Sequence, residues 1–81
     1  MAKLLHKPEE LKVTANIEGT PLTVTRNGKA EHVTKIYQHW HTSDELEAIK
    51  HYFRVRTNKG QIYDIYRHAT SNLWYLERIY D

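Results

Sequence analysis

The chain has 81 residues and a formal net charge of +2, from twelve lysines and arginines against ten aspartates and glutamates. This length allows one domain with a modest core, because a short chain buries only about 60% of the surface that its unfolded form exposes. The absence of cysteine excludes disulfides, thiolate metal sites and a cysteine nucleophile. The small net charge lacks the concentrated basic footprint of a dedicated nucleic-acid binder.

The start of the chain carries no secretory or membrane signal. No apolar run approaches the roughly 18 residues that cross a bilayer, and the opening MAKLLHKPEE lacks an apolar stretch of about 7–15 residues. We therefore expect a cytoplasmic protein without a membrane partner. Pro8 supplies no N–H and pushes Lys7 toward extended geometry. Residues 1–9 are accordingly predicted to form an N-terminal arm or edge piece of a single domain that spans residues 1–81.

Two strand signals follow in the first half of the chain. Apolar and polar residues alternate from Leu11 to Ile17, which is typical of a strand with one buried face. Asn27-Gly28 then lies between two β-prone runs and predicts a hairpin, since a type I′ turn needs positive φ at both central residues. The predicted cross-strand pairs are Arg26 with Lys29, Val24 with Glu31, and Leu22 with Val33.

The return strand of this hairpin is predicted to run to Trp40 or His41 and to bend, so that it serves two neighbours. Residues 43–50 then give the one helical signal of the chain. Thr42 and Glu45 fit a capping box, and acidic residues fill the first turn. Because an isolated helix of two turns is marginal, we expect a brief helix or ordered loop across one end of the sheet.

The last third of the chain predicts three strands joined by two short turns. Asn58-Lys59-Gly60 fits a three-residue hairpin loop with a left-handed glycine, and residues 69–72 fit a four-residue loop. The first loop places Val55 opposite Tyr63, Phe53 opposite Ile65 and Tyr52 opposite Tyr66. The second places Ile65 opposite Leu76, Tyr66 opposite Tyr75 and Tyr63 opposite Arg78. One face of this meander is apolar and consists of Phe53, Val55, Tyr63, Ile65, Trp74 and Leu76. The other, mixed face consists of Tyr52, Arg54, Arg56, Ile62, Asp64, Tyr66, Tyr75, Glu77 and Ile79.

A sheet with one apolar face and no long helix to cover it must curl on itself or pack on a second sheet. We therefore predict an all-β fold of five to six antiparallel strands. The meander is expected to curl into a small SH3-like or partly open barrel, with the short helix or loop near residues 43–50.

The end of the chain carries a resemblance. After Tyr66-Arg67 and a short loop it reads Leu73-Trp74-Tyr75-Leu76-Glu77-Arg78-Ile79-Tyr80-Asp81, which resembles the ending of a family of small uncharacterised bacterial domains. The upstream pieces that also resemble this family are Lys7-Pro8, Gly19-Thr20-Pro21, the Asn27-Gly28 hairpin that leads to Trp40, and Tyr52-Phe53-Arg54-Val55. The resemblance covers nearly the whole chain apart from residues 43–50. It implies a bacterial cytoplasmic origin and no established activity, so it assigns no functional residue.

The mixed face is the first candidate binding surface. Its candidate residues are Tyr52, Arg54, Arg56, Tyr66 and Tyr75. Tyrosines beside arginines are the chemistry with which sheets bind single-stranded nucleic acids, by base stacking and phosphate contacts. The same tyrosines are equally typical of ordinary cross-strand packing, and Arg54 faces Asp64, which cancels part of the field that a phosphate would feel.

His39 and His41 form a weak candidate metal pair, because residues two apart share one face of a strand. Zinc takes three or four protein ligands, so histidines solvated near a rim are the stronger interpretation. The acidic residues 44–47 fit the start of a helix better than catalysis. The sequence has no phosphate-binding glycine loop and no nucleophile elbow, and we expect neither an enzyme nor a cofactor.

These features together predict a non-enzymatic binding module. We expect it to contact another protein, or a second copy of itself, through an exposed sheet edge or the mixed face. The alternative is a domain that binds single-stranded nucleic acid with Tyr52, Arg54, Arg56 and Tyr66.

Overall fold

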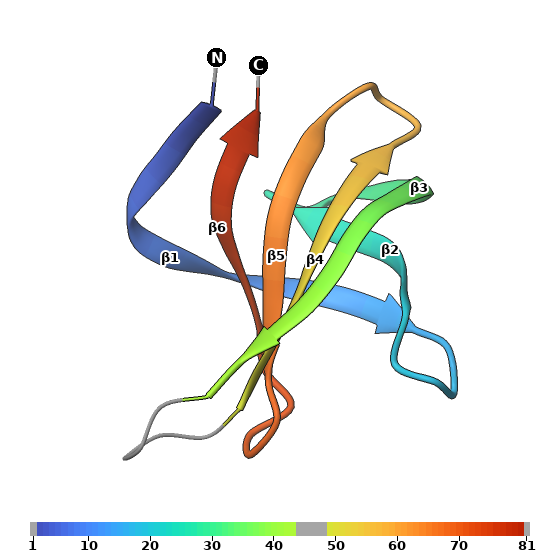
Figure 1. The fold of residues 1–81 in the computed structure, drawn as a ribbon. Coiled ribbons are helices and arrows are strands. Elements are labelled where there is room, and N and C mark those ends of the chain that lie inside the picture. The colour runs from blue at the N-terminus through green and yellow to red at the C-terminus, as the bar shows by residue number, and fades with distance from the viewer. Residues whose placement is uncertain (1, 44–48, 81) are drawn as a thin grey trace.

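The computed structural model describes residues 2–43 and 49–80, which form six β-strands (Figure 1). The strands are β1 (Ala2–Ala15), β2 (Pro21–Arg26), β3 (Lys29–Thr42), β4 (Lys50–Thr57), β5 (Ile62–His68) and β6 (Trp74–Tyr80). Each strand is antiparallel to the next, and β1 also pairs with β6, so the meander closes into a barrel-like ring. The all-β prediction of five to six antiparallel strands is confirmed.

The ring closes because β1 and β3, with 14 residues each, are long enough to serve two neighbours. The first part of β1 pairs with β6 and its last residues pair with β2, while β3 begins against β2 and continues against β4. A five-stranded sheet, β1-β6-β5-β4-β3, therefore shares both bent strands with a smaller sheet, β1-β2-β3. Residues 2–9, predicted as an arm or edge piece, form the first part of β1.

The predicted hairpin at Asn27-Gly28 is present. Both residues have positive φ, 54° and 77°, as a type I′ turn requires. Arg26 pairs with Lys29 and Val24 pairs with Glu31, as expected. The ladder ends at Thr23 and His32, one pair short of the predicted partners Leu22 and Val33.

The end of β1 differs from the prediction. The strand stops at Ala15 because Asn16 begins a turn, in which its side-chain oxygen accepts hydrogen bonds from the N–H groups of Glu18 (2.9 Å) and Thr20 (3.0 Å). Asparagine side chains compete with sheet ladders in this way. The turn leaves Ile17 fully exposed, so the prediction that Ile17 shares the buried face of Leu11 was wrong.

The closing meander has the predicted register between β4 and β5. Val55 pairs with Tyr63 and Phe53 with Ile65. The turn between them contains Gly60 at φ 78°, and the Gly60 N–H donates to the Thr57 carbonyl at 2.9 Å. The local turn chemistry therefore fixed this part of the sheet.

The pairing of β5 with β6 begins as predicted, with Ile65 opposite Leu76, but shifts at a β-bulge. Asp64 pairs with Arg78, which leaves Glu77 without an opposite residue. A bulge moves the following side chains to the other face. Ile79 consequently lies opposite Tyr63 and packs against the core, and Arg78 lies opposite Asp64 on the outer side. The predicted outward position of Ile79 and the Tyr63–Arg78 pair were wrong.

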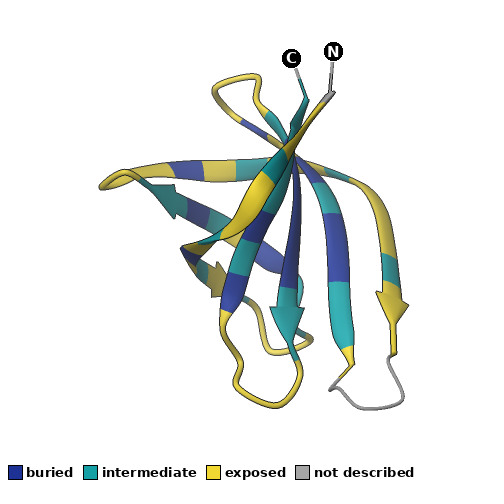
Figure 2. Ribbon diagram, turned by 90° about the vertical axis from the view of Figure 1, so that its left-hand side faces the viewer, coloured by how far each residue is buried: buried dark blue, intermediate teal, exposed yellow. Residues whose placement is uncertain are grey.

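The core lies inside the ring. It contains all six residues of the predicted apolar face, joined by Leu11 from β1 and Val24 from β2. Figure 2 shows the buried segments on the central strands and exposed loops around them. Because residues of both sheets meet in this cluster, the ring holds one common core.

The predicted helix or loop near residues 43–50 falls mostly on residues 44–48, which lie outside the described residues. On either side, β3 ends at Thr42 and β4 begins at Lys50. In the part of the chain that the structure describes, no helix is long and apolar enough to cross a membrane.

Candidate functional site

The structure places the predicted site residues on the outer side of the five-stranded sheet, opposite the core. Tyr52 pairs with Tyr66, which pairs with Tyr75, so the three tyrosines lie side by side on β4, β5 and β6. Trp40 of β3 pairs with Tyr52 and extends the line. We call these four residues the aromatic row. Trp40 was not among the predicted site residues, because no local turn signal fixes the pairing of β3 with β4.

The rings of the aromatic row pack against one another, with Trp40–Tyr52 and Tyr66–Tyr75 stacked and Tyr52–Tyr66 tilted. Their centroids are 5.2 Å apart for Trp40 and Tyr52, 5.1 Å for Tyr52 and Tyr66, and 5.3 Å for Tyr66 and Tyr75. These distances approach the strand spacing of about 4.8 Å, and the interplanar angles are 6°, 40° and 27°. The rings therefore stand on the sheet with their faces toward each other. Tyr52 and Tyr66 are only 8% and 5% exposed as a result.

Cationic side chains flank the row. The Lys50 ammonium lies 5.2 Å from the ring centroid of Tyr66. The Arg54 guanidinium lies 5.6 Å from the ring of Trp40 and 4.9 Å from that of Tyr80. Cations at these distances from aromatic faces are attracted by the ring quadrupole. The arginine thus links the row to Tyr80 at the end of β6.

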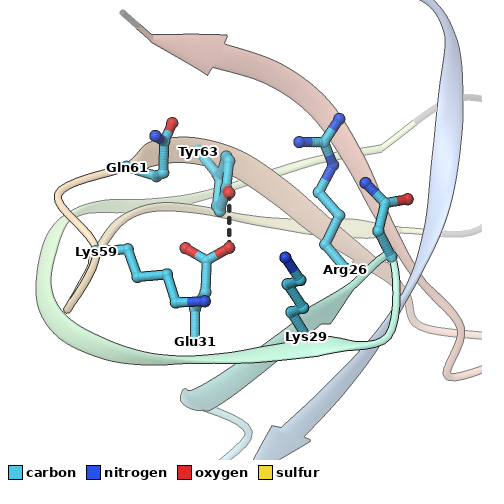
Figure 3. Close-up of a pocket in the computed structure, with 7 residues that line it drawn as sticks. Arg26, Lys29, Glu31, Lys59, Gln61 and Tyr63 are labelled. Atoms are coloured by element: carbon cyan, nitrogen blue, oxygen red, sulfur yellow. Dashed lines mark hydrogen bonds between the residues drawn. The ribbon is translucent and has the colours of Figure 1, made fainter.

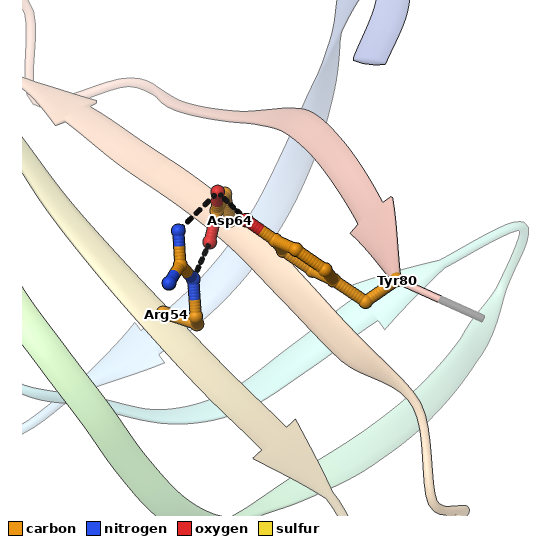
Figure 4. A network of polar contacts seen from close by, with 3 residues as sticks. All are labelled: Arg54, Asp64 and Tyr80. Atoms are coloured by element: carbon orange, nitrogen blue, oxygen red, sulfur yellow. Dashed lines mark hydrogen bonds and ion pairs between the residues drawn. The ribbon is translucent and has the colours of Figure 1, made fainter. Parts of the chain in front are cut away.

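A polar network fixes Arg54 in this position (Figure 4). The Arg54 Nε donates to Asp64 Oδ1 at 2.8 Å and its terminal nitrogen to Oδ2 at 3.3 Å, while the Tyr80 hydroxyl donates to Oδ2 at 2.8 Å. Asp64 is 3% exposed, so its carboxylate needs these donors. The hydrogen bond to Asp64 raises the pKa of Arg54, against the opposing effect of burial.

A shallow apolar hollow lies next to this network. It has a volume of about 420 Å³ and is lined by Tyr37, Arg54, Ile62 and Tyr80. Tyr37 is 43% exposed, and the Lys35 ammonium lies 4.9 Å from its ring centroid. The outer side therefore offers a recess that is lined by two tyrosines and by Arg54, whose side chain is fixed by Asp64.

The outer side of β3 to β6 has a basic charge balance. Its cations are Lys35, Lys50, Arg54, Arg56 and Arg78, and its carboxylates are Asp64 and Glu77, with Glu10 of β1 beside Tyr75 at the edge of the same side. The Asp64 carboxylate already accepts hydrogen bonds from Arg54 and Tyr80. Arg56, by contrast, is exposed. A ligand that approaches this side therefore meets a positive field.

Three phenols of the outer side, those of Tyr52, Tyr66 and Tyr80, resist ionisation. Burial, with the nearby Glu77 carboxylate, raises the pKa of Tyr52 to about 12, and burial raises the pKa of Tyr66 and of Tyr80 as well. Because these folded-state values exceed the reference of about 10, the groups stabilise the fold below pH 10, and this contribution is lost as pH rises toward 12.

We expect an alkaline titration to show this directly. Tyrosinate absorbance at 295 nm should rise in two phases for the native protein, the later phase coinciding with loss of the circular dichroism signal. In concentrated urea the same titration should give a single phase near pH 10. A single phase near pH 10 in the native protein would contradict the burial of these phenols.

The candidate metal pair lies on the opposite side of β3. The ring of His39 stacks on Phe53 at 4.4 Å with an interplanar angle of 2°, and His41 pairs with His51. The His51 ring lies 6.4 Å from His39 and 6.3 Å from His41. Among residues 2–43 and 49–80 there is no group of three or more histidines or carboxylates placed to hold a metal ion.

This histidine cluster predicts an acid sensitivity of the fold. Burial lowers the pKa of His51, and Arg67, His39 and His41 lower it further. The unfolded chain therefore binds this proton more readily, and stability should fall as pH drops below about 6.5. The urea midpoint of the natural protein should be lower at pH 5.5 than at pH 7.5. We expect this difference to be smaller in His51→Gln and unchanged in the control variant His6→Gln. An unchanged difference in His51→Gln would contradict this role.

Together these features define a small all-β domain with an aromatic, basic outer face. Comparison of the chain with known protein families, with curated proteins and with solved structures found no match in any of the three. The resemblance of the final segment to small bacterial domains therefore stays a prediction, and function is argued from the site alone.

Proposed function

We propose that this chain is a non-enzymatic binding module that contacts an acidic segment of another protein through its outer face. The observation that carries the proposal is the aromatic row, whose packed rings lie between the cationic side chains of Lys50 and Arg54. Tyrosine and arginine are the residue types enriched where proteins bind one another. The hollow beside Tyr37 and Tyr80 offers a recess for one apolar side chain of the partner.

The sheet edges suit this contact less well. β1 and β3 are the outermost strands of the five-stranded sheet. The exposed part of β1 carries Lys3, Lys7 and Pro8, and the pairing of β3 with β4 is interrupted by two register shifts. Lysine, proline and bulges on edge strands act against strand addition. A second copy of the chain is also disfavoured on the outer face, because two basic faces repel each other.

Single-stranded nucleic acid is the alternative, and the positive field of the outer face favours it. Base stacking, however, requires an accessible ring face. The faces of Tyr52 and Tyr66 are covered by their neighbours in the aromatic row. An acidic peptide uses the same positive field and needs no free ring face, so the protein partner is the better supported of the two.

Selection from a random 12-residue peptide library tests the proposal. We expect the selected peptides to be rich in Asp and Glu with an aromatic or aliphatic residue. Their affinity, measured by fluorescence anisotropy, should fall at least about tenfold in Tyr37→Ala/Arg56→Ala. These two residues are exposed, so the fold should be retained. Ile17→Ala/Lys3→Ala is the matched control, with one exposed apolar residue and one cation removed elsewhere.

Two outcomes would overturn this function. One is selection of peptides that bind both double variants with equal affinity. The other is binding of fluorescent dT20 or rU20 that weakens steeply with salt and is lost in Tyr37→Ala/Arg56→Ala, which would assign the face to single-stranded nucleic acid.

A further inference from the structure

A second polar recess lies away from the outer face, between the turn that joins β2 to β3 and the turn that joins β4 to β5. Its volume is about 340 Å³, at the small end of the roughly 300–1,000 Å³ typical of small-molecule sites. Figure 3 shows its lining side chains. The lining residues are Arg26, Asn27, Lys29, Glu31, Lys59, Gln61 and Tyr63.

Glu31 at the base of this recess is an unusual buried carboxylate. It is 7% exposed and accepts hydrogen bonds from two neutral hydroxyls, those of Thr57 (2.7 Å) and Tyr63 (3.0 Å). Within the described residues no cation lies within 4 Å of its oxygens. Burial of a carboxylate is costly, and each of its oxygens can accept a second hydrogen bond. Glu31 is therefore placed to accept a further donor from the recess.

Three cations line the recess together with this carboxylate. Lys29 and Lys59 are exposed and, in Figure 3, reach toward Glu31 from opposite sides. The Arg26 Nε donates to Glu9 at 3.1 Å, and the Arg26 guanidinium also interacts with the Tyr63 hydroxyl. These cations come from two turns that are far apart in the sequence and close together in space. With Glu31 as the lining carboxylate and Glu9 paired with Arg26, the recess keeps a small net positive charge, which attracts anions.

Hydrogen bonds fix the turn between β4 and β5 against strand β3. The Asn58 N–H donates to the His32 carbonyl at 2.8 Å, and the His32 N–H donates to the Asn58 side-chain oxygen at 3.0 Å. The Asn27-Gly28 turn is fixed by its type I′ geometry. The recess is thus preorganised, which lowers the cost of ordering it when a ligand binds.

We propose that this recess binds a small phosphate monoester that carries a hydroxyl group. Lys29, Lys59 and the terminal nitrogens of Arg26 contact the phosphate, whose charge of about −2 suits several cations. Glu31 accepts a hydrogen bond from the ligand hydroxyl, as it does from Thr57 and Tyr63. This site is separate from the outer face and does not depend on the function proposed for that face.

Nuclear magnetic resonance titration with ribose 5-phosphate, inorganic phosphate and ribose tests the site. Ribose 5-phosphate should shift the amides of Asn27, Lys29, Gly60 and Gln61 and bind at least about tenfold more tightly than either other probe, because only it satisfies both the cations and the carboxylate. Lys29→Ala/Lys59→Ala should lose about tenfold or more in affinity. Lys3→Ala/Lys7→Ala removes the same charge from β1 and should bind as the natural protein does.

Glu31→Gln separates the two parts of the site. This variant should bind ribose 5-phosphate and inorganic phosphate with similar affinity, and thermal unfolding shows whether it folds. If Glu31→Gln does not fold, the relative affinities of the natural protein for ribose 5-phosphate, inorganic phosphate and ribose still test the role of Glu31. The proposal is overturned if millimolar ribose 5-phosphate leaves these amides unshifted, if both lysine double variants bind it equally, or if inorganic phosphate binds the natural protein as tightly.

Discussion

Ile65→Ala is expected to destabilise the fold by about 2–5 kcal/mol, the range for removing a large aliphatic side chain from a core. Ile65 has no solvent exposure. It lies between Phe53 and Leu76 on the neighbouring strands, where three rigid backbones limit collapse of the cavity. Domains have about 0.05–0.15 kcal/mol of stability per residue, so the loss is a large share of the total. Equilibrium unfolding in urea measures it.

Ile17→Ala provides a control with the same chemical change. Ile17 is fully exposed in the turn after β1, and exposed substitutions usually change stability by less than about 0.5 kcal/mol. A loss in Ile17→Ala equal to that in Ile65→Ala would contradict the assignment of Ile17 to the surface and of Ile65 to the core.

Asp64→Asn is expected to cost about 1.5–3 kcal/mol, the range for hydrogen bonds to a charged group. The amide keeps the shape of the carboxylate but has one acceptor oxygen where Arg54 and Tyr80 require two. The Arg54 side chain is 33% exposed, so water can solvate the freed guanidinium, and the low end of the range applies. Urea unfolding again gives the value.

The same variant should release Arg54 from the aromatic row. Because its guanidinium lies over Trp40 and Tyr80, we expect a change in tryptophan fluorescence in native Asp64→Asn. Glu18→Gln, the same change at an exposed carboxylate, should alter neither stability nor fluorescence. Native-like stability of Asp64→Asn would show that the network around Asp64 contributes little.

The pairing of neighbouring strands was predictable where a turn determined it. Asn27-Gly28 and Asn58-Lys59-Gly60 need particular backbone conformations, and a turn of known length sets which residues face each other. The pairs Val24 with Glu31 and Val55 with Tyr63 followed from this, as did the contact of Tyr52 with Tyr66. Most of the core and three of the four residues of the aromatic row could therefore be predicted from local chemistry.

Contacts between distant segments were not predictable in this way. The bulge at Glu77 carries Ile79 inward and so leaves Arg78 and Tyr80 on the outer face, yet no residue type marks it. Trp40 of β3 pairs with Tyr52 of β4. No turn signal in residues 43–49, which connect the two strands, predicts the register of this pairing. The recess around Glu31 combines side chains from two hairpins that the sequence separates by about thirty positions.

The sequence by itself determined the strands, two of their turns and the separation of apolar from mixed faces, because alternation and turn conformation are properties of neighbouring residues. The tertiary structure decided how β1 closes the ring against β6, which aromatic rings stack into one row, and that a carboxylate is buried among three cations. The closure of the ring, the addition of Trp40 to the row and the recess around Glu31 arise only when the bent strands β1 and β3 bring distant side chains together, because the resulting distances depend on the curvature of the whole sheet.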